Sequence, residues 1–237
     1  MKKVIGLLFC LLLVLSACGS AGLPEGSGTA SGGDSPALPE AYAEILGNLV
    51  NAYPWDDDPT VLVPENPELS YLYRYNSQLA QIGFALVDLD RNGQAELIIS
   101  DPDKPFIYDL HTLSEGTAVH LFASGERYCF YLFENGAVEN QWSGAAVMNG
   151  HDFYRLENGK LMFLERILMD AYHALDAGLI TDISQADEKN TFFRSPTENE
   201  KDYILIPYEE AIATIETYQN ANDPLTIEFT LLSEYKQ

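Results

Sequence analysis

The sequence predicts an α+β fold: an antiparallel β-meander of successive hairpins, with N-terminal and C-terminal helices packed on it. Two stretches carry the hairpin signal, because residues 130–138 and 153–161 both place an Asn-Gly pair between two strand-like runs. A weaker copy surrounds Ser114-Glu115-Gly116. Apolar residues spaced three and four positions apart, near both ends of the folded part, indicate the helices.

The first helix is expected over Leu38–Tyr53, beginning at Pro39 and ending before a second proline. A short helix ending at Tyr75 should follow it, and a longer one is expected over Pro207–Gln219. Five apolar side chains share one face of the first helix: Tyr42, Ile45, Leu46, Leu49 and Tyr53.

The strands are expected where short apolar runs are separated by Gly, Asn, Asp, Pro or Ser. Phe163–Leu179 fits either a continued strand or a short helix, and residues 182–200 are polar enough to be a loop. Tyr203–Ile206 and Leu225–Leu232 are further strand candidates. The main series is Gly83–Val87, Glu96–Ile99, Phe106–Leu110, Val119–Phe122, Arg127–Phe133, Ala137–Trp142, Phe153–Leu156 and Lys160–Glu165.

Residues 1–17 have the pattern of a secretory signal peptide. Lys2 and Lys3 form its basic start, and the apolar run Val4–Leu15 is too short for a permanent membrane span. The L-S-A-C ending resembles the bacterial lipobox, which implies that Cys18 is lipidated and becomes the first residue of the mature chain. The alternative is an ordinary signal peptide with an incidental cysteine. The resemblance implies a location in the bacterial cell envelope, at the outer face of the cytoplasmic membrane.

The remainder of the chain divides into a linker and one domain. Residues 18–37 combine the candidate lipidated cysteine with a Gly- and Ser-rich stretch that has no apolar periodicity, which is typical of a flexible linker. Residues 38–237 are expected to form a single globular domain. Cys129 is the one cysteine left after the signal peptide and Cys18, so no intramolecular disulfide is expected.

The charge of the chain argues against one class of partner. The formal net charge is −23, from 36 acidic and 13 basic residues. Such a surface repels nucleic acid and attracts cations. A solubilising acidic surface on an exported protein accounts for the same composition.

Residues 88–96 have the spacing of a short calcium loop between two strands. Calcium takes six to eight hard oxygen ligands, and short carboxylates can reach it from a tight turn. Gly93 permits the positive φ that folds the chain around the ion. Five oxygen donors recur at every second position: Asp88, Asp90, Asn92, the main-chain carbonyl of Gln94, and Glu96, directly or through water.

This loop is not a complete EF-hand. Ile99 occupies the twelfth position counted from Asp88, where the bidentate glutamate of an EF-hand belongs. The apolar run after Glu96 is β-branched, which favours a strand over a helix. The alternative interpretation is an Asx-rich hairpin turn that needs no metal.

The segment V-D-L-D-R-N-G-Q-A-E-L-I-I resembles the calcium loops of FG-GAP or VCBS-type repeats in integrin-like β-propellers. It is also similar to the single loop of this kind in many bacterial lipoproteins. The resemblance implies a structural Ca²⁺ held by Asp88, Asp90, Asn92, the Gln94 main chain and Glu96. Asn92 stands where the family usually has aspartate. The loop occurs once here, whereas propellers repeat it.

The sequence shows no catalytic motif that would define an enzyme. None of His111, His120, His151 and His173 falls in an H-E-x-x-H pattern, and there is no nucleophile elbow or phosphate loop. We therefore expect a membrane-anchored, calcium-stabilised binding or interaction module without catalytic residues. The alternative is a cell-wall or polysaccharide hydrolase, or its accessory factor, with its carboxylates hidden among the many acids.

The expected partners are the membrane, through the lipid, and a carbohydrate or an envelope protein. Aromatic side chains near the loop, and one at a turn, are the observation behind this expectation, because aromatic faces stack on sugars or on proline-rich peptides. The alternative is a tyrosine-rich edge of the core. The aromatic residues in question are Trp55, Tyr71, Tyr73, Tyr75 and Trp142.

Overall fold

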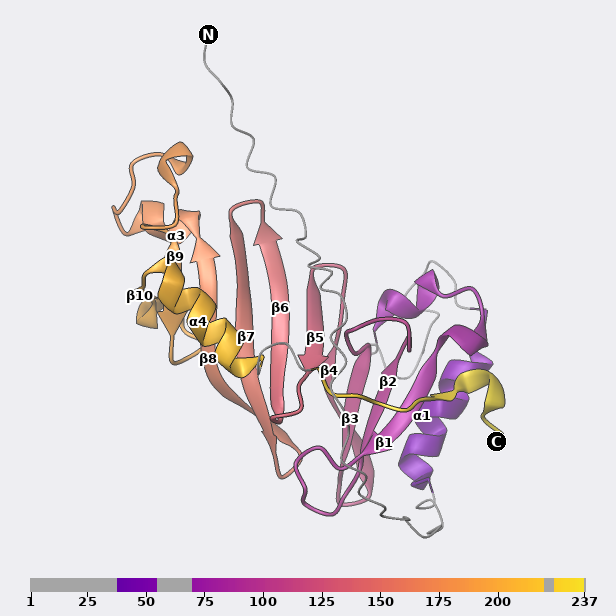
Figure 1. Ribbon diagram of the computed structural model, residues 1–237. Coiled ribbons are helices and arrows are strands. Elements are labelled where there is room, and N and C mark those ends of the chain that lie inside the picture. Colours follow the sequence, from indigo (N-terminus) through magenta and orange to yellow (C-terminus); the bar gives the residue numbers. More distant parts are fainter. Residues whose placement is uncertain (1–37, 55–69, 220–223, 237) are drawn as a thin grey trace, which may run out of the picture. The chain divides into compact units, whose positions relative to one another are not determined.

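The computed structural model describes residues 38–54, 70–219 and 224–236 (Figure 1). Leu38–Gln237 form one compact unit. The expected signal peptide, Cys18 and the linker lie outside the described residues, as does the start of the expected helix before Tyr75. In the part of the chain that is described, no helix is both long enough and apolar enough to cross a membrane.

The fold is mostly β, with antiparallel pairing throughout and few helices. A first sheet has five strands in the order β11-β1-β2-β3-β4. Its strands are β1 (Gly83–Val87), β2 (Glu96–Ser100), β3 (Asp109–Ser114), β4 (Thr117–Ala123) and β11 (Thr230–Leu231).

A second sheet has six strands in the order β10-β9-β8-β7-β6-β5. Neighbours in this sheet are also neighbours in the sequence, and β7 and β8 are the longest strands. The strands are β5 (Tyr128–Leu132), β6 (Ala137–Ala145), β7 (Met148–Glu157), β8 (Lys160–Asp170), β9 (Phe192–Ser195) and β10 (Ile204–Leu205).

The helices are short. The α-helices are α1 (Glu40–Asn51), α3 (Ala171–Asp176) and α4 (Tyr208–Tyr218). The 3₁₀ helices are η1 (Tyr71–Tyr75), η2 (Leu79–Gln81), η3 (Ile183–Gln185), η4 (Glu200–Asp202) and η6 (Leu232–Glu234).

The apolar core consists of several clusters, one of which joins residues of both sheets. Leu97 and Ile99 of β2 pack against Tyr42 and Leu46 of α1, so α1 covers one face of the first sheet (Figure 1). Ile98 lies on the opposite face of that sheet, in a different cluster. Helix α4 contacts β8 and β9 of the second sheet. Its buried Ala211 belongs to the same cluster as residues of β7 and β8.

Several expected elements need correction. The expected single sheet is two sheets, because the ladder after β4 is reduced to isolated bridges such as Ile107 with Phe130. The expected loop at 182–200 contains β9, which pairs with β8. The expected strand Leu225–Leu232 reaches the sheet only at Thr230–Leu231. Short strands of this kind are defined by the neighbour they pair with and not by their own residues.

The hairpin turns follow the sequence signal. Asn158 and Gly159 both have positive φ, as do Glu115 and Gly116, and two consecutive positive φ values define the type I′ turn that matches strand twist. The segment Phe163–Leu179, for which the sequence allowed either a strand or a helix, contains both. Its first part belongs to β8, which ends at Asp170, and α3 begins at the next residue.

One irregularity interrupts the first sheet. The register between β3 and β4 shifts by one residue after the pair Leu110–Phe122, so that His111 lies opposite His120. The extra residue on β4 is Leu121, which has no partner on β3. This is a β-bulge, a feature that changes the direction of the side chains that follow it.

Candidate functional site

Three carboxylates converge where β1 ends and β2 begins. Asp88 follows β1, Glu96 is the first residue of β2, and Asp90 lies in the loop between them. Each offers one oxygen, and these oxygens lie within 4.8 Å of one another. Among the described residues, no Lys or Arg forms an ion pair with any of the three. The loop therefore concentrates negative charge without a protein cation to balance it.

The loop is held by hydrogen bonds from its own backbone. The Asp88 carboxylate accepts the N–H of Asn92 at 3.0 Å on Oδ1 and that of Gly93 at 2.9 Å on Oδ2. Arg91 and Gly93 have φ values of 59° and 89°, which turn the chain back toward β2. Each carboxylate oxygen has more than one acceptor direction, so an oxygen that accepts one N–H can still bind a cation.

Glu96 is the buried member of the group, with no exposed surface. Its Oε2 accepts the N–H of Leu89 at 3.0 Å, and its Oε1 accepts the hydroxyl of Thr112 at 3.1 Å. Burial raises the pKa of Glu96 above its ordinary value, and the charges of Asp90 and Asp88 raise it further. A bound divalent cation would oppose both effects, because its charge stabilises the ionised carboxylate.

The two other predicted ligands lie within the same loop. The Asn92 amide donates to Asp90 Oδ2 at 3.0 Å, and its Oδ1 accepts the N–H of Gln94 at 2.7 Å. The Gln94 side chain donates to the carbonyl of Leu113 at 2.7 Å. Three of the five predicted ligands thus form one cluster. The roles of Asn92 and of the Gln94 carbonyl as ligands stay predictions.

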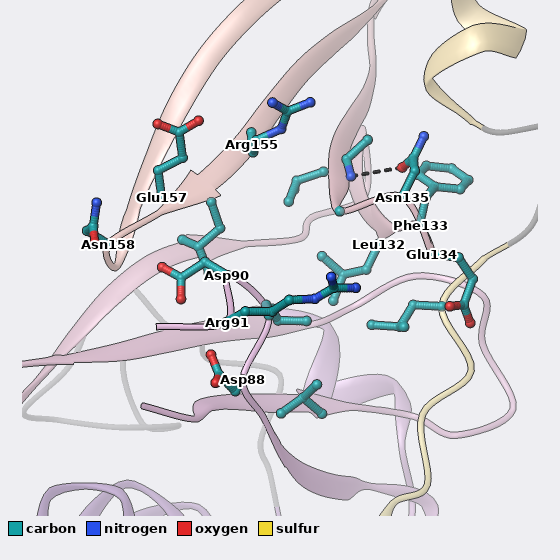
Figure 2. A pocket seen from close by; sticks show the side chains of 17 residues that line it. Asp88, Asp90, Arg91, Leu132, Phe133, Glu134, Asn135, Arg155, Glu157 and Asn158 are labelled. Carbon is teal, nitrogen blue, oxygen red and sulfur yellow. Dashed lines mark hydrogen bonds between the residues drawn. The ribbon is translucent and has the colours of Figure 1, made fainter. Parts of the chain in front are cut away.

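A cavity of about 540 Å³ opens beside the loop (Figure 2). It is formed by the loop after β1, the β5–β6 turn, the β7–β8 turn and Leu225. Four carboxylates and two guanidinium groups line it, above an apolar floor that includes Leu132 and Val138. The charged lining residues are Asp88, Asp90, Glu134, Glu157, Arg91 and Arg155.

The loop is connected to the second sheet by Asp90. Its Oδ2 accepts the N–H of Gly159 in the β7–β8 turn at 2.9 Å, a contact between residues far apart in the chain. In Figure 2, Asp90 lies between Asp88 and the turn that carries Glu157 and Asn158. The shape of the cavity therefore depends on the conformation of the loop.

Glu96 gives the metal-free protein a characteristic pH dependence. Because the folded protein raises the pKa of this carboxyl above its ordinary value of 4.5, the native state binds the proton more tightly than the unfolded state does. The stability that Glu96 contributes is therefore fully present below about pH 4.5 and is lost as the pH rises through the raised pKa. We expect the free energy of unfolding of the metal-free protein to fall, relative to Glu96→Gln, as the pH rises from 4.5 through the raised pKa.

Urea unfolding at a series of pH values, in the presence of a chelator, measures this difference. Saturating Ca²⁺ should abolish the relative loss, since the ion binds the ionised carboxylate. Parallel pH curves for the wild type and Glu96→Gln without metal would contradict the expectation.

Two other buried carboxylates already have protein partners. Glu139 accepts the amide N–H of Gln219 at 3.0 Å on both oxygens and that of Gln141 at 3.2 Å on Oε2, and its Oε1 lies 2.6 Å from Nδ1 of His151. Glu165 accepts the hydroxyl of Tyr218 at 2.6 Å. Neither carboxylate lines the cavity.

Of the aromatic residues proposed to bind sugars, Trp55 lies outside the described residues. Tyr73, Tyr75 and Trp142 do not form one exposed face. Tyr73 has no exposed surface and belongs to the core under α1, whereas Tyr75 is exposed. Trp142 donates its indole N–H to Asp152 at 3.0 Å. The residues that sequence reasoning missed are Thr112 and Gly159, which come from distant hairpins. The sequence predicts a turn at Asn158-Gly159, but it does not predict the contact between this turn and Asp90.

The geometry identifies a loop of oxygen ligands beside a polar cavity. The chain shows no match to any protein-family model, to any curated protein or to any solved structure.

Proposed function

We propose that this chain is a lipid-anchored, extracytoplasmic binding protein, in which Ca²⁺ held by the loop at 88–96 shapes a cavity for an uncharged polar ligand. The observation that supports this proposal most directly is that Asp88 and Asp90 belong both to the carboxylate cluster and to the wall of the cavity. An ion bound there would fix one side of the ligand site.

The choice of Ca²⁺ rests on the ligand chemistry of the loop. The cluster of Asp88, Asp90 and Glu96 offers only oxygen, which suits calcium better than zinc or copper. An irregular loop that follows a strand also suits the variable coordination geometry of calcium better than the near-ideal octahedron that magnesium requires.

The choice of an uncharged ligand rests on the charges around the cavity. Together with Glu96, the four carboxylates and two guanidinium groups of the lining give an excess of three negative charges, which one divalent ion would reduce to one. Such a lining disfavours an anionic ligand. A neutral saccharide fits such a lining, because its hydroxyl groups can bond to the carboxylates and guanidinium groups. Its C–H faces can pack on the apolar floor beside Phe133.

Binding of a panel of neutral di- and trisaccharides, measured by isothermal titration calorimetry with and without Ca²⁺, tests the proposal. We expect a saccharide of the panel to bind only with Ca²⁺ present. Arg155→Ala, which removes an exposed guanidinium group from the cavity wall, should weaken binding about ten-fold or more, as a lost hydrogen bond to a charged group does.

Arg127→Ala is the matched control, because Arg127 is also exposed but does not line the cavity. Binding that is equally strong without Ca²⁺, or equally affected in both arginine variants, would refute the assignment of this cavity.

The lipid anchor is supported by the sequence alone, through the basic start, the short apolar run and the L-S-A-C ending. In a bacterial host that processes lipoproteins, Cys18→Ser should move the protein from the membrane fraction to the soluble exported fraction. Ser16→Ala, a neighbouring change that leaves the cysteine in place, serves as the control. Membrane retention of Cys18→Ser would count against lipidation.

A further inference from the structure

A second group of metal-ligating side chains lies in the first sheet, away from the carboxylate loop. Asp109 and His111 are two residues apart on β3, and His120 lies opposite His111 on β4. Each offers one ligand atom, and the three atoms lie within 4.8 Å of one another. The two imidazole rings have their centroids 4.8 Å apart.

This cluster lies on the other face of the sheet from the loop carboxylates. His111 pairs with Leu97 and Asp109 pairs with Ile99, and both of these β2 residues face α1. Glu96 precedes Leu97, so alternation along the strand directs its side chain to the opposite face. The two groups of ligands are therefore separate sites.

One nitrogen of the His111 ring lacks a hydrogen-bond partner among the described residues. Its Nε2 is buried and accepts or donates no hydrogen bond among the residues that the structure describes. The whole residue is 1% exposed. A buried imidazole nitrogen without a hydrogen-bond partner is available to a metal ion.

The Asp109 carboxylate is buried and held in place from several directions. It accepts the N–H of Ser70 at 3.0 Å on Oδ1 and 3.2 Å on Oδ2, and it accepts the hydroxyl of Tyr73 on Oδ2. Nε2 of His120 lies 2.9 Å from Oδ1. Hydrogen bonds of this kind orient the ligating carboxylate in metal sites.

We propose that Asp109, His111 and His120 form a second metal site, for a transition metal of the Zn²⁺ type. Two imidazoles and one carboxylate match the ligands of zinc and not those of calcium. In a tetrahedral site with bonds of about 2.0–2.1 Å, the ligand atoms lie about 3.3 Å apart. The His120–Asp109 pair, now at 2.9 Å, would open slightly, and the atoms that are farther apart, within 4.8 Å, would approach one another. Three protein ligands leave a fourth position for water or another donor.

A purely structural interpretation explains only part of the cluster. An ion pair between His120 and Asp109 would satisfy the carboxylate without any metal. It would leave the buried Nε2 of His111 without a partner beside that pair, and a buried polar atom is normally hydrogen-bonded. A bound metal satisfies all three groups at once.

Titration of the chelator-treated, full-length protein with Co²⁺, in the presence of excess Ca²⁺, tests the proposal. We expect one equivalent of Co²⁺ to give the visible absorption of a low-symmetry N/O site, and Zn²⁺ to displace it. Absence of stoichiometric Co²⁺ and Zn²⁺ binding to the wild type would overturn the proposal.

Variants locate the site. His111→Gln should abolish the Co²⁺ spectrum, whereas His173→Gln, a histidine of α3, and Asp88→Asn, in the calcium loop, should retain it. Tyr73→Phe should weaken Zn²⁺ binding 10–100-fold while the ligands stay in place. A spectrum that persists in His111→Gln would refute the assignment.

A measurement on the wild type covers the case in which His111→Gln does not fold. Of the four histidines, Zn²⁺ should shift the imidazole NMR resonances of His111 and His120 and leave those of His151 and His173 unchanged. Shifts confined to His151 or His173 would overturn the proposal.

Discussion

Addition of Ca²⁺ to the chelator-treated protein is expected to raise the melting temperature by about 5–10 °C. Free Ca²⁺ at about 100 times its dissociation constant stabilises the native state by about 2.7 kcal/mol, and a chain of this length gains about 2–4 °C for each kcal/mol. The source of the effect is the convergence of Asp88, Asp90 and Glu96 without a basic partner among the described residues. Differential scanning calorimetry, followed by chelator to reverse the shift, measures it.

Asp88→Asn should remove most of this calcium-dependent shift, because it deletes a charge and a ligand oxygen from the cluster. Asp176→Asn is the matched control, since Asp176 is exposed at the end of α3 and far along the chain from the loop. A melting temperature that does not respond to Ca²⁺, or a response that survives in Asp88→Asn, would leave the turn interpretation of the loop as the correct one.

Gly159→Ala is expected to lower the free energy of unfolding by about 2–3 kcal/mol and to weaken Ca²⁺ binding. Gly159 has a φ of 70°, which costs an L-residue about 1–2 kcal/mol. A Cβ there would also approach the hydroxyl of Thr112 to 2.9 Å. Because that hydroxyl donates to Glu96 and the Gly159 N–H donates to Asp90, the substitution disturbs two members of the carboxylate cluster.

Gly136→Ala provides the control. Gly136 has a similar φ of 81°, but an added Cβ would meet no atom within 4 Å. We therefore expect it to lose only the backbone cost of about 1–2 kcal/mol and to bind Ca²⁺ as the wild type does. Urea unfolding and calcium titration of both variants separate the two effects. Equal calcium affinity in the two variants would show that the β7–β8 turn does not support the loop.

Local signals in the sequence predicted the local parts of the structure. The turn at Asn158-Gly159 has the positive φ values that its residues favour, and α1 and β1 lie where the periodicity indicated. The carboxylates at 88–96 could be grouped from the sequence because one short loop carries them all.

Features that depend on distant residues were not predictable in the same way. The division into two sheets depends on how β4 and β5 pair, and their connection carries no Asn-Gly signal. The strand Phe192–Ser195 is flanked by polar residues, and β8 defines it by pairing with it. The cavity depends on three turns from different hairpins, so none of its lining beyond the loop could be assigned beforehand.

The β-bulge at Leu121 has a chemical consequence for the two candidate metal sites. If the register of the pair Leu110–Phe122 continued without interruption, His120 would lie opposite Thr112, on the face that carries Glu96. The additional residue instead directs His120 to the face of His111. A single irregularity in β4 thus places the histidine nitrogen atoms and the carboxylate oxygen atoms of the loop on opposite faces of the sheet. The two faces can therefore favour chemically different ions.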